Sequence, residues 1–211
     1  MTADVPLPSA LPAALAGRLV HDVMGHLSGI VSGLDLLNDP TARAMHADAL
    51  TLATASVRSL HDDMAYSRML YGVGAGTMEI GALESMTKSL FAGRRATLDW
   101  SPSVTPLSAI AGRTLLGFVR LAAEALFAGG VATVTAAAAP TGLVVRVVAA
   151  GPRVRFPEET LLGLAGRPQD GGLAGKWAPA FHLWAAATAA GGSVSITKTD
   201  LGVTLETRFP V

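Results

Sequence analysis

The chain has 211 residues, of which 50% are apolar and 15% are charged, so it can bury a sizeable core in one or two domains. Sixteen basic residues balance sixteen acidic ones and aromatic residues make up only 5%, so we expect neither nucleic acid nor an anionic membrane as a partner. The sequence has no cysteine, which excludes disulfides, thiol catalysis and iron–sulfur clusters and fits a reducing compartment.

No export or membrane segment is predicted. The N-terminal stretch lacks a basic region ahead of its apolar residues, unlike a signal peptide. Two long uncharged runs, at 125–145 and 177–196, are interrupted by glycine, proline or histidine, whereas a spanning helix needs about 20 mostly apolar residues. We therefore expect a cytoplasmic protein.

Two long helices are predicted first, from near Leu11 to Leu37 and from about Thr41 to Tyr71. Asp39 is expected to cap the second helix, with Pro40 in its first turn. Each helix carries core-compatible positions spaced by threes and fours: Leu15, Leu19, Val23, His26, Ile30, Leu34 and Leu37, then His46, Leu50, Ala53, Val57, Leu60, Met64, Ser67 and Tyr71. This pattern predicts an antiparallel hairpin that completes a four-helix bundle with a second copy of the chain.

The rest of the chain predicts an α+β sandwich with helices on one face of a mixed sheet. The expected elements are a helix at 77–93, a strand at 96–100, a helix at 107–127, a β-hairpin at 131–150, an irregular region at 151–175 with one short helix, a helix at 179–190 and a final β-hairpin at 193–210. We therefore predict a helical-hairpin domain at 10–75 and a second domain at 77–211.

His21 is the candidate for chemistry. Residues within about 60° of it around the helix are small or polar, so His21 is expected to face solvent from a low surface; they are Gly17, Arg18, Gly25, Ser28, Ser32 and Asp35. An exposed imidazole is nucleophilic near neutral pH, and the adjacent Asp22 could orient the ring or take its proton. The alternative interpretation is an ordinary surface histidine.

The remaining histidines are weaker candidates. His26, His46 and His61 are interpreted as structural or solvated residues. His21 and His26 diverge by about 140° around the helix, so the two make a poor pair of metal ligands.

Four stretches in this order resemble a known family: "LVHDV", "AYSRMLYG", "LLGFVRLAAEALFAGG" and the terminal "GGSVSI…VTLETRFP". The first resembles the H-box of two-component signalling proteins. Together they resemble bacterial histidine phosphotransferases of ChpT type, in which a dimeric helical hairpin precedes a degenerate histidine-kinase ATPase (Bergerat-type) domain. In the family's "R-x-x-[FY]-G" ending of the second helix, Arg68 is expected to have a structural role. His26 lies near the proline of many H-boxes, so the first helix lacks a proline kink there.

The resemblance argues against an active kinase. Kinases of this fold use an asparagine on the long helix as a metal ligand, and the only asparagine here, Asn38, lies between the first two helices. Their adenine-binding D-x-G-x-G motif corresponds to a stretch in which Ala149 replaces the aspartate, Gly151 is retained and Arg153 replaces the second glycine. "DGGLAG" at 170–175 is one glycine short of such a motif. Glu124 would be a lone metal ligand.

The resemblance implies a homodimeric phosphotransferase in a bacterial phosphorelay. His21 would accept a phosphoryl group from a receiver-domain aspartate of a hybrid kinase and pass it to a response regulator, with Asp22 assisting. No cofactor of its own is expected, because the receiver would supply Mg²⁺. Gly25, Ser28 and Ser32 would form the docking surface with Arg18, which either meets phosphate or is a solvated charge. The alternatives are a catalytically inactive dimer that binds receivers, a purely structural helical dimer, and an active kinase.

Overall fold

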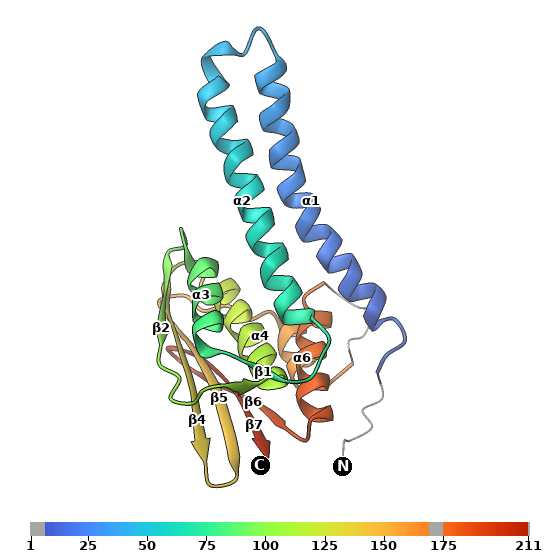
Figure 1. Cartoon of the computed structure of the whole chain (residues 1–211), viewed down its shortest axis with the longest axis vertical. Coiled ribbons are helices and arrows are strands. Elements are labelled where there is room, and N and C mark those ends of the chain that lie inside the picture. The colour runs from blue at the N-terminus through green and yellow to red at the C-terminus, as the bar shows by residue number, and fades with distance from the viewer. Residues whose placement is uncertain (1–6, 169–174, 211) are drawn as a thin grey trace.

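Two long antiparallel helices project from an α/β body in the computed structural model, which describes residues 7–168 and 175–210 (Figure 1). The helices are α1 (Leu11–Asn38) and α2 (His46–Tyr71), joined by a short 3₁₀ helix, η1 (Arg43–Met45). The base of the hairpin rests on the body, and its tip points away from it (Figure 1). The predicted α+β class is confirmed.

The predicted start of the second helix is wrong, because the chain forms a turn before it. The Asp39 carboxylate accepts hydrogen bonds from the backbone N–H of Thr41 at 2.8 Å and from its hydroxyl at 2.6 Å. This side-chain bond holds Pro40 in a turn that precedes η1, so Asp39 caps the turn and α2 begins only at His46.

The predicted seam of α2 divides into two faces. Ala53 and Ser67 are buried, and His46 and Leu60 are half-buried. Leu50, Val57 and Met64 instead are exposed, Val57 by 51%. A second exposed stripe lies on α1, where apolar residues again recur by fours and threes; it consists of Val20, Met24, Leu27, Val31 and Leu34. The single chain therefore leaves one apolar face of its hairpin uncovered.

The body contains one five-stranded mixed sheet in the order β2-β4-β5-β7-β6. Its strands are β2 (Ala96–Trp100), β4 (Gly130–Ala139), β5 (Gly142–Ala150), β6 (Ser193–Thr199) and β7 (Gly202–Pro210). Only β2 and β4 run parallel to each other; the other neighbours are antiparallel. Strand β4 alternates buried Ala132, Val134 and Ala136 with less buried threonines, because only one of its faces meets the core.

Helices cover that face of the sheet, as predicted. They are α3 (Ile80–Phe91), α4 (Ala109–Ala125), the short α5 (Glu158–Leu164) and α6 (Trp177–Ala189). The predicted helices at 77–93 and 107–127 both start too early. Their first residues form two short strands, β1 (Thr77–Met78) and β3 (Leu107–Ser108), which pair with each other. The hydroxyl of Ser108 then caps α4 by accepting from Ala111 N at 3.4 Å.

Both helices of the hairpin contact the body at the base of the hairpin. Leu11 at the start of α1 is buried with Trp177 and Phe181 of α6, whose rings stack at 4.5 Å. On α2, the buried hydroxyl of Tyr66 donates to the carbonyl of Leu116 on α4 at 2.6 Å. Tyr71, at the end of α2, packs its ring 5.6 Å from that of His182 on α6. These contacts bring the side chain of Arg120 on α4 to Asp22, the residue after His21 on α1.

Candidate functional site

His21 faces solvent from the third turn of α1. Its side chain is 83% exposed, and its Nδ1 lies 3.3 Å from Asp22 Oδ1. The exposure agrees with the helical spacing. Because Nδ1 faces the carboxylate, the other ring nitrogen, Nε2, is the one left for a reaction partner.

Asp22 connects the exposed ring to buried charges. Its side chain is only 20% exposed, and its Oδ2 accepts from Arg18 Nε at 3.0 Å and lies 3.4 Å from Arg120 Nη2. Burial opposes the charge, but the hydrogen bond and charge of Arg18, the hydrogen bond of His21 and the charge of Arg120 together lower the pKa of Asp22. Asp22 lies eleven residues after the start of α1, well beyond the first turn of the helix.

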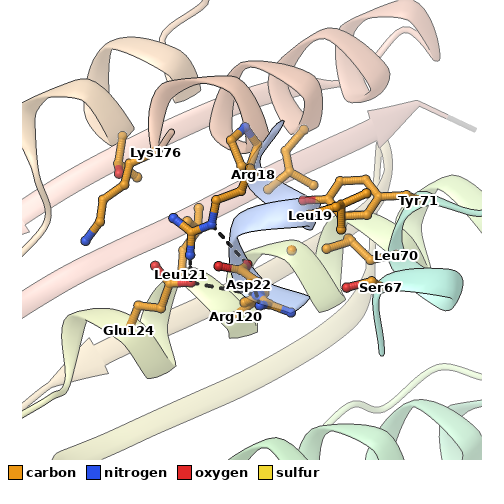
Figure 2. Close-up of a pocket in the computed structure, with 14 residues that line it drawn as sticks. Arg18, Leu19, Asp22, Ser67, Leu70, Tyr71, Arg120, Leu121, Glu124 and Lys176 are labelled. Carbon is orange, nitrogen blue, oxygen red and sulfur yellow. Dashed lines mark hydrogen bonds and ion pairs between the residues drawn. The ribbon is translucent and has the colours of Figure 1, made fainter. Parts of the chain in front are cut away.

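Four charged side chains converge where the hairpin meets α4 (Figure 2). Glu124 Oε1 lies 3.6 Å from Arg18 Nη2 and 3.7 Å from Arg120 Nε. Arg18 is thus half-buried in ion pairs rather than solvated as a free charge. Burial by itself would lower the pKa of Arg18, but Asp22 and Glu124 raise it. The cluster is positioned by two elements, α1 and α4, that are about 100 residues apart in sequence.

Arg120 is the site residue that the sequence analysis missed. Its side chain is 17% exposed, its Cζ lies 5.8 Å from the ring centroid of Tyr66, and its Nη1 lies 3.8 Å from Asp63 Oδ1. A signal was available, since Arg120 and Glu124 are the only charges between positions 114 and 130 and lie one turn apart. Two charges on a buried helix call for partners from elsewhere in the fold.

The surface next to His21 along α1 is low and open. Gly25, Ser28 and Ser32 are all exposed, as predicted. A Cβ atom added at Gly25 would meet nothing within 4 Å. The Ser28 hydroxyl donates to the carbonyl of Met24 at 2.9 Å and so lies close to the helix. Nothing on this stripe stands in the way of a second protein approaching His21.

The other histidines have different surroundings. His61 also faces solvent, with Nδ1 3.2 Å from Asp62 Oδ1, but Asp62 is 61% exposed. His26 Nε2 lies 2.8 Å from Asp63 Oδ2 and joins α1 to α2. A histidine followed by an aspartate therefore occurs twice on the hairpin. Of these two pairs, only His21–Asp22 has a carboxylate that is paired with arginines in the described part of the chain.

The motif "R-x-x-[FY]-G" owes its structural role to its last two residues. Arg68 is exposed on α2, and no hydrogen bond or ion pair involves its side chain among the described residues. Tyr71 packs on α6, whereas a Cβ atom at Gly72 would lie 2.6 Å from the carbonyl oxygen of Arg68. In the described part of the chain, the contacts of this motif thus come from Tyr71 and Gly72 rather than from the side chain of Arg68.

The described residues around α4 do not fit a nucleotide with Mg²⁺. Glu124 is engaged by Arg18 and Arg120, and the cavity beside it has about 30 Å³, enough for only a water or two. Ala149, at the position of the adenine-binding aspartate, is buried in β5. The backbone N–H of Arg155 donates to the carbonyl of Ala125 at the end of α4, at 3.1 Å. An open groove of about 570 Å³ next to α4 is lined by both acidic and basic residues, Glu124, Glu159, Arg155 and Lys176. No cluster of three or more metal-binding side chains occurs among residues 7–168 and 175–210.

All but the last residue of "DGGLAG" lies outside the described residues. Within the described ranges, no helix is long and apolar enough to cross a bilayer.

Solved structures with this fold include histidine kinases. The histidine kinase domain of the blue-light activated kinase EL346 from Erythrobacter litoralis is 14% identical, with a TM-score of 0.50, over 89% of this chain and 95% of that chain. Full-length ShkA in complex with AMPPNP is 16% identical, with a TM-score of 0.52, over 94% of this chain and 46% of that chain. The chain therefore has a histidine-kinase-like fold.

A bacterial phosphotransferase solved at 1.7 Å is more similar, with a TM-score of 0.85 and 20% identity over 97% of this chain and 98% of that chain. The family model for the histidine phosphotransferase C-terminal domain matches residues 80–202, which is more than half of the chain. The protein belongs to the histidine phosphotransferase family, and the resemblance described from the sequence is confirmed. None of the curated proteins matches it at a significant level.

Proposed function

We propose that the protein is a phosphorelay intermediate that accepts a phosphoryl group on His21 from a receiver-domain aspartate and passes it to the receiver of a response regulator. The observation that carries this proposal is the exposed imidazole whose Nδ1 lies 3.3 Å from the carboxylate of Asp22. Membership of the histidine phosphotransferase family supports it. The small-residue stripe of Gly25, Ser28 and Ser32 supports close approach of a receiver.

The transfer is a substitution at phosphorus. The lone pair of His21 Nε2 attacks the phosphorus of the aspartyl phosphate in line, and the bond from phosphorus to the carboxylate oxygen breaks. That oxygen leaves with the bonding pair as an aspartate carboxylate. The ring now carries the phosphoryl group on Nε2 and a proton on Nδ1, and the negative charge of Asp22 offsets the positive charge of the ring. Transfer to the second receiver reverses these steps on another aspartate.

The charges around the phosphate come from the partner in this proposal. Phosphoryl transfer depends mainly on positioning and on neutralising the charge of the phosphoryl oxygens. Arg18 and Arg120 are already paired with Asp22 and Glu124. The receiver therefore supplies the Mg²⁺ and its own cations, while this chain supplies the nucleophile and the docking surface.

The uncovered face of the hairpin supports a homodimer. Val20, Met24 and Val31 on α1 and Leu50 and Val57 on α2 form exposed apolar stripes with the spacing of helical-bundle seams. A symmetric pairing of two hairpins buries the same stripe on each copy and completes four helices. The stripe on α1 lies about 100° around the helix from His21, so pairing leaves the imidazole accessible.

The test follows acid-labile phosphate on the full-length protein. A radiolabelled receiver phosphate is expected to label the parent and the His61→Gln protein but not His21→Gln. His61 is the matched control, because it is an exposed histidine beside an aspartate on the same hairpin. Label on His21→Gln would overturn the assignment of the nucleophile. Receivers that bind without transferring label would favour an inactive binding dimer, and labelling of the parent by ATP and Mg²⁺ alone would favour a kinase.

A further inference from the structure

We propose that Arg120 is a positioning residue for His21: from the ATPase-like body it holds the Asp22 carboxylate so that Oδ1 faces the imidazole Nδ1. The phosphoacceptor site then consists of parts from both the hairpin and the body. The effect on transfer rate rests on the proposed function, whereas the effect on the ring itself does not.

The two oxygens of Asp22 have different partners. Oδ2 lies 3.0 Å from Arg18 Nε and 3.4 Å from Arg120 Nη2, whereas Oδ1 lies 3.3 Å from His21 Nδ1. Two guanidinium groups on one oxygen restrict rotation of the carboxylate. The second oxygen is consequently directed at the ring rather than at solvent.

Arg120 is itself fixed from several sides. Its Nε lies 3.7 Å from Glu124 one turn along α4, its Nη1 lies 3.8 Å from Asp63 on α2, and its guanidinium lies over the ring of Tyr66 at 5.8 Å. Arg18 has a shorter contact with Asp22, but it belongs to the same helix and is more exposed. The anchor that relates Asp22 to a rigid surface outside α1 is therefore Arg120.

The His61–Asp62 pair shows what the same local sequence does without this anchor. Its Nδ1 to Oδ1 distance, 3.2 Å, nearly equals that of His21 and Asp22. Asp62 is however largely exposed, and no arginine pairs with it among the described residues. Water competes for such a carboxylate, so its contact with the ring is weakly enforced.

A fixed acceptor at Nδ1 selects a tautomer. A carboxylate that accepts from Nδ1–H keeps the proton on that nitrogen and leaves the lone pair on Nε2, which is the nitrogen that faces a partner. Without the anchor, the ring also populates the form with its proton on Nε2. In that form Nε2 has no lone pair with which to attack phosphorus. Arg120 therefore acts through Asp22 on the fraction of rings that are ready to react.

The test compares Arg120→Gln with Arg113→Gln in the full-length protein. Arg113 lies on the same helix, but its guanidinium donates to the carbonyl of Gly74 at 3.0 Å, away from Asp22. Long-range ¹H–¹⁵N NMR at alkaline pH reports which nitrogen of neutral His21 carries the proton. We expect Nδ1–H to predominate in the parent and in Arg113→Gln, and the Nε2–H form to rise in Arg120→Gln.

A second variant distinguishes loss of positioning from misfolding. Arg120→Lys keeps the buried positive charge without the planar fork, so we expect a tautomer ratio between those of the parent and Arg120→Gln. Receiver-to-His21 transfer is expected to slow by about tenfold in Arg120→Gln, within the range that positioned proton-holding groups contribute. An unchanged tautomer ratio in both Arg120 variants would overturn the proposal. If no receiver phosphorylates the parent, the proposed function fails, and the NMR result still decides the role of Arg120.

Discussion

At the scale of single residues, the exposed ring of His21 is linked to charges that are not exposed. The imidazole of His21 lies in solvent, but the carboxylate beside it is paired with Arg18 and Arg120 at the joint between hairpin and body. Ion pairs that are partly buried and share hydrogen bonds contribute more than pairs on an open surface. Asp22 therefore has two sets of contacts, one with the arginines between hairpin and body and one with the ring of His21.

The ion pairs of Asp22 between the hairpin and the body predict that the stability of the folded protein depends on pH. Its pKa is lowered in the folded protein, so the ionised form favours folding; this stability is present above the ordinary pKa of 3.8 and is lost as the pH falls through the folded value. Asp22→Asn should lower the free energy of unfolding at pH 7 by about 1–3 kcal/mol, as expected for hydrogen bonds to a charged group. The difference from the parent should shrink at about pH 3, measured by urea unfolding. Equal stability at pH 7 would show that the ion pairs contribute nothing.

The docking role of the small residues predicts a steric block. Ser28 is exposed on the His21 stripe, so a tryptophan there should hinder an approaching receiver while leaving the fold intact. Ser28→Trp should slow receiver-to-His21 transfer by at least about tenfold, whereas Ala55→Trp on the exposed face of α2 should not. Transfer kinetics with a phosphorylated receiver measure both. Equal rates for the two variants would place the docking surface elsewhere.

At the scale of elements, the hairpin is held together by close helix contact near its tip and by side-chain bonds nearer its base. A Cβ atom at Gly33 of α1 would lie 2.7 Å from the backbone oxygen of Ala49 and 2.9 Å from the Cβ of Ala53. Lower down, His26 and Asp63 join the two helices at 2.8 Å. The hairpin consequently stays narrow, and its apolar residues are divided between an inner and an outer face.

This close contact predicts opposite effects of one substitution at two glycines of the same helix. Gly33→Ala forces α1 and α2 apart and should lower the free energy of unfolding by about 1–3 kcal/mol. Gly25→Ala meets no atom within 4 Å. Alanine there should raise the free energy of unfolding by about 0.5–1 kcal/mol, through helix propensity alone. Thermal or urea unfolding measures both, and a destabilised Gly25→Ala protein would contradict the open surface around His21.

At the scale of the whole molecule, the two parts of the chain are joined as one unit. Leu11 is buried against α6, Tyr66 bonds to α4, and the Arg18–Asp22–Arg120–Glu124 cluster lies between these contacts. The body therefore reaches Asp22, the residue next to His21, through Arg120.

The uncovered hairpin face predicts the assembly state. Val57 is 51% exposed in the single chain, so Val57→Asp costs the isolated fold little. In a four-helix bundle the same change buries an unpaired charge, at a cost of several kcal/mol to association. Light scattering at micromolar concentration should give a dimer for the parent and for Ala55→Asp, but a monomer for Val57→Asp. A monomeric parent would rule out the bundle.

The sequence by itself determined what depends on local pattern. The extent of α1, the strand at 96–100, the two β-hairpins and the exposure of His21 follow from helical or alternating periodicity and from glycine-containing turns. The order of the four family-like stretches was enough to indicate the fold. The boundaries that were wrong, at His46, Thr77 and Leu107, are those where a turn or a two-residue strand pairing replaced the expected first turn of a helix.

Only the tertiary structure decided which residues surround the reactive ring. Arg120 is 98 positions from Asp22 in sequence, and no period or motif relates the two. Burial of α4 against the hairpin brings them together, because charges on a buried helix must be compensated by partners from another element. The division of the hairpin's apolar residues between inner and outer faces was likewise decided by packing, since a spacing of threes and fours is equally compatible with either face.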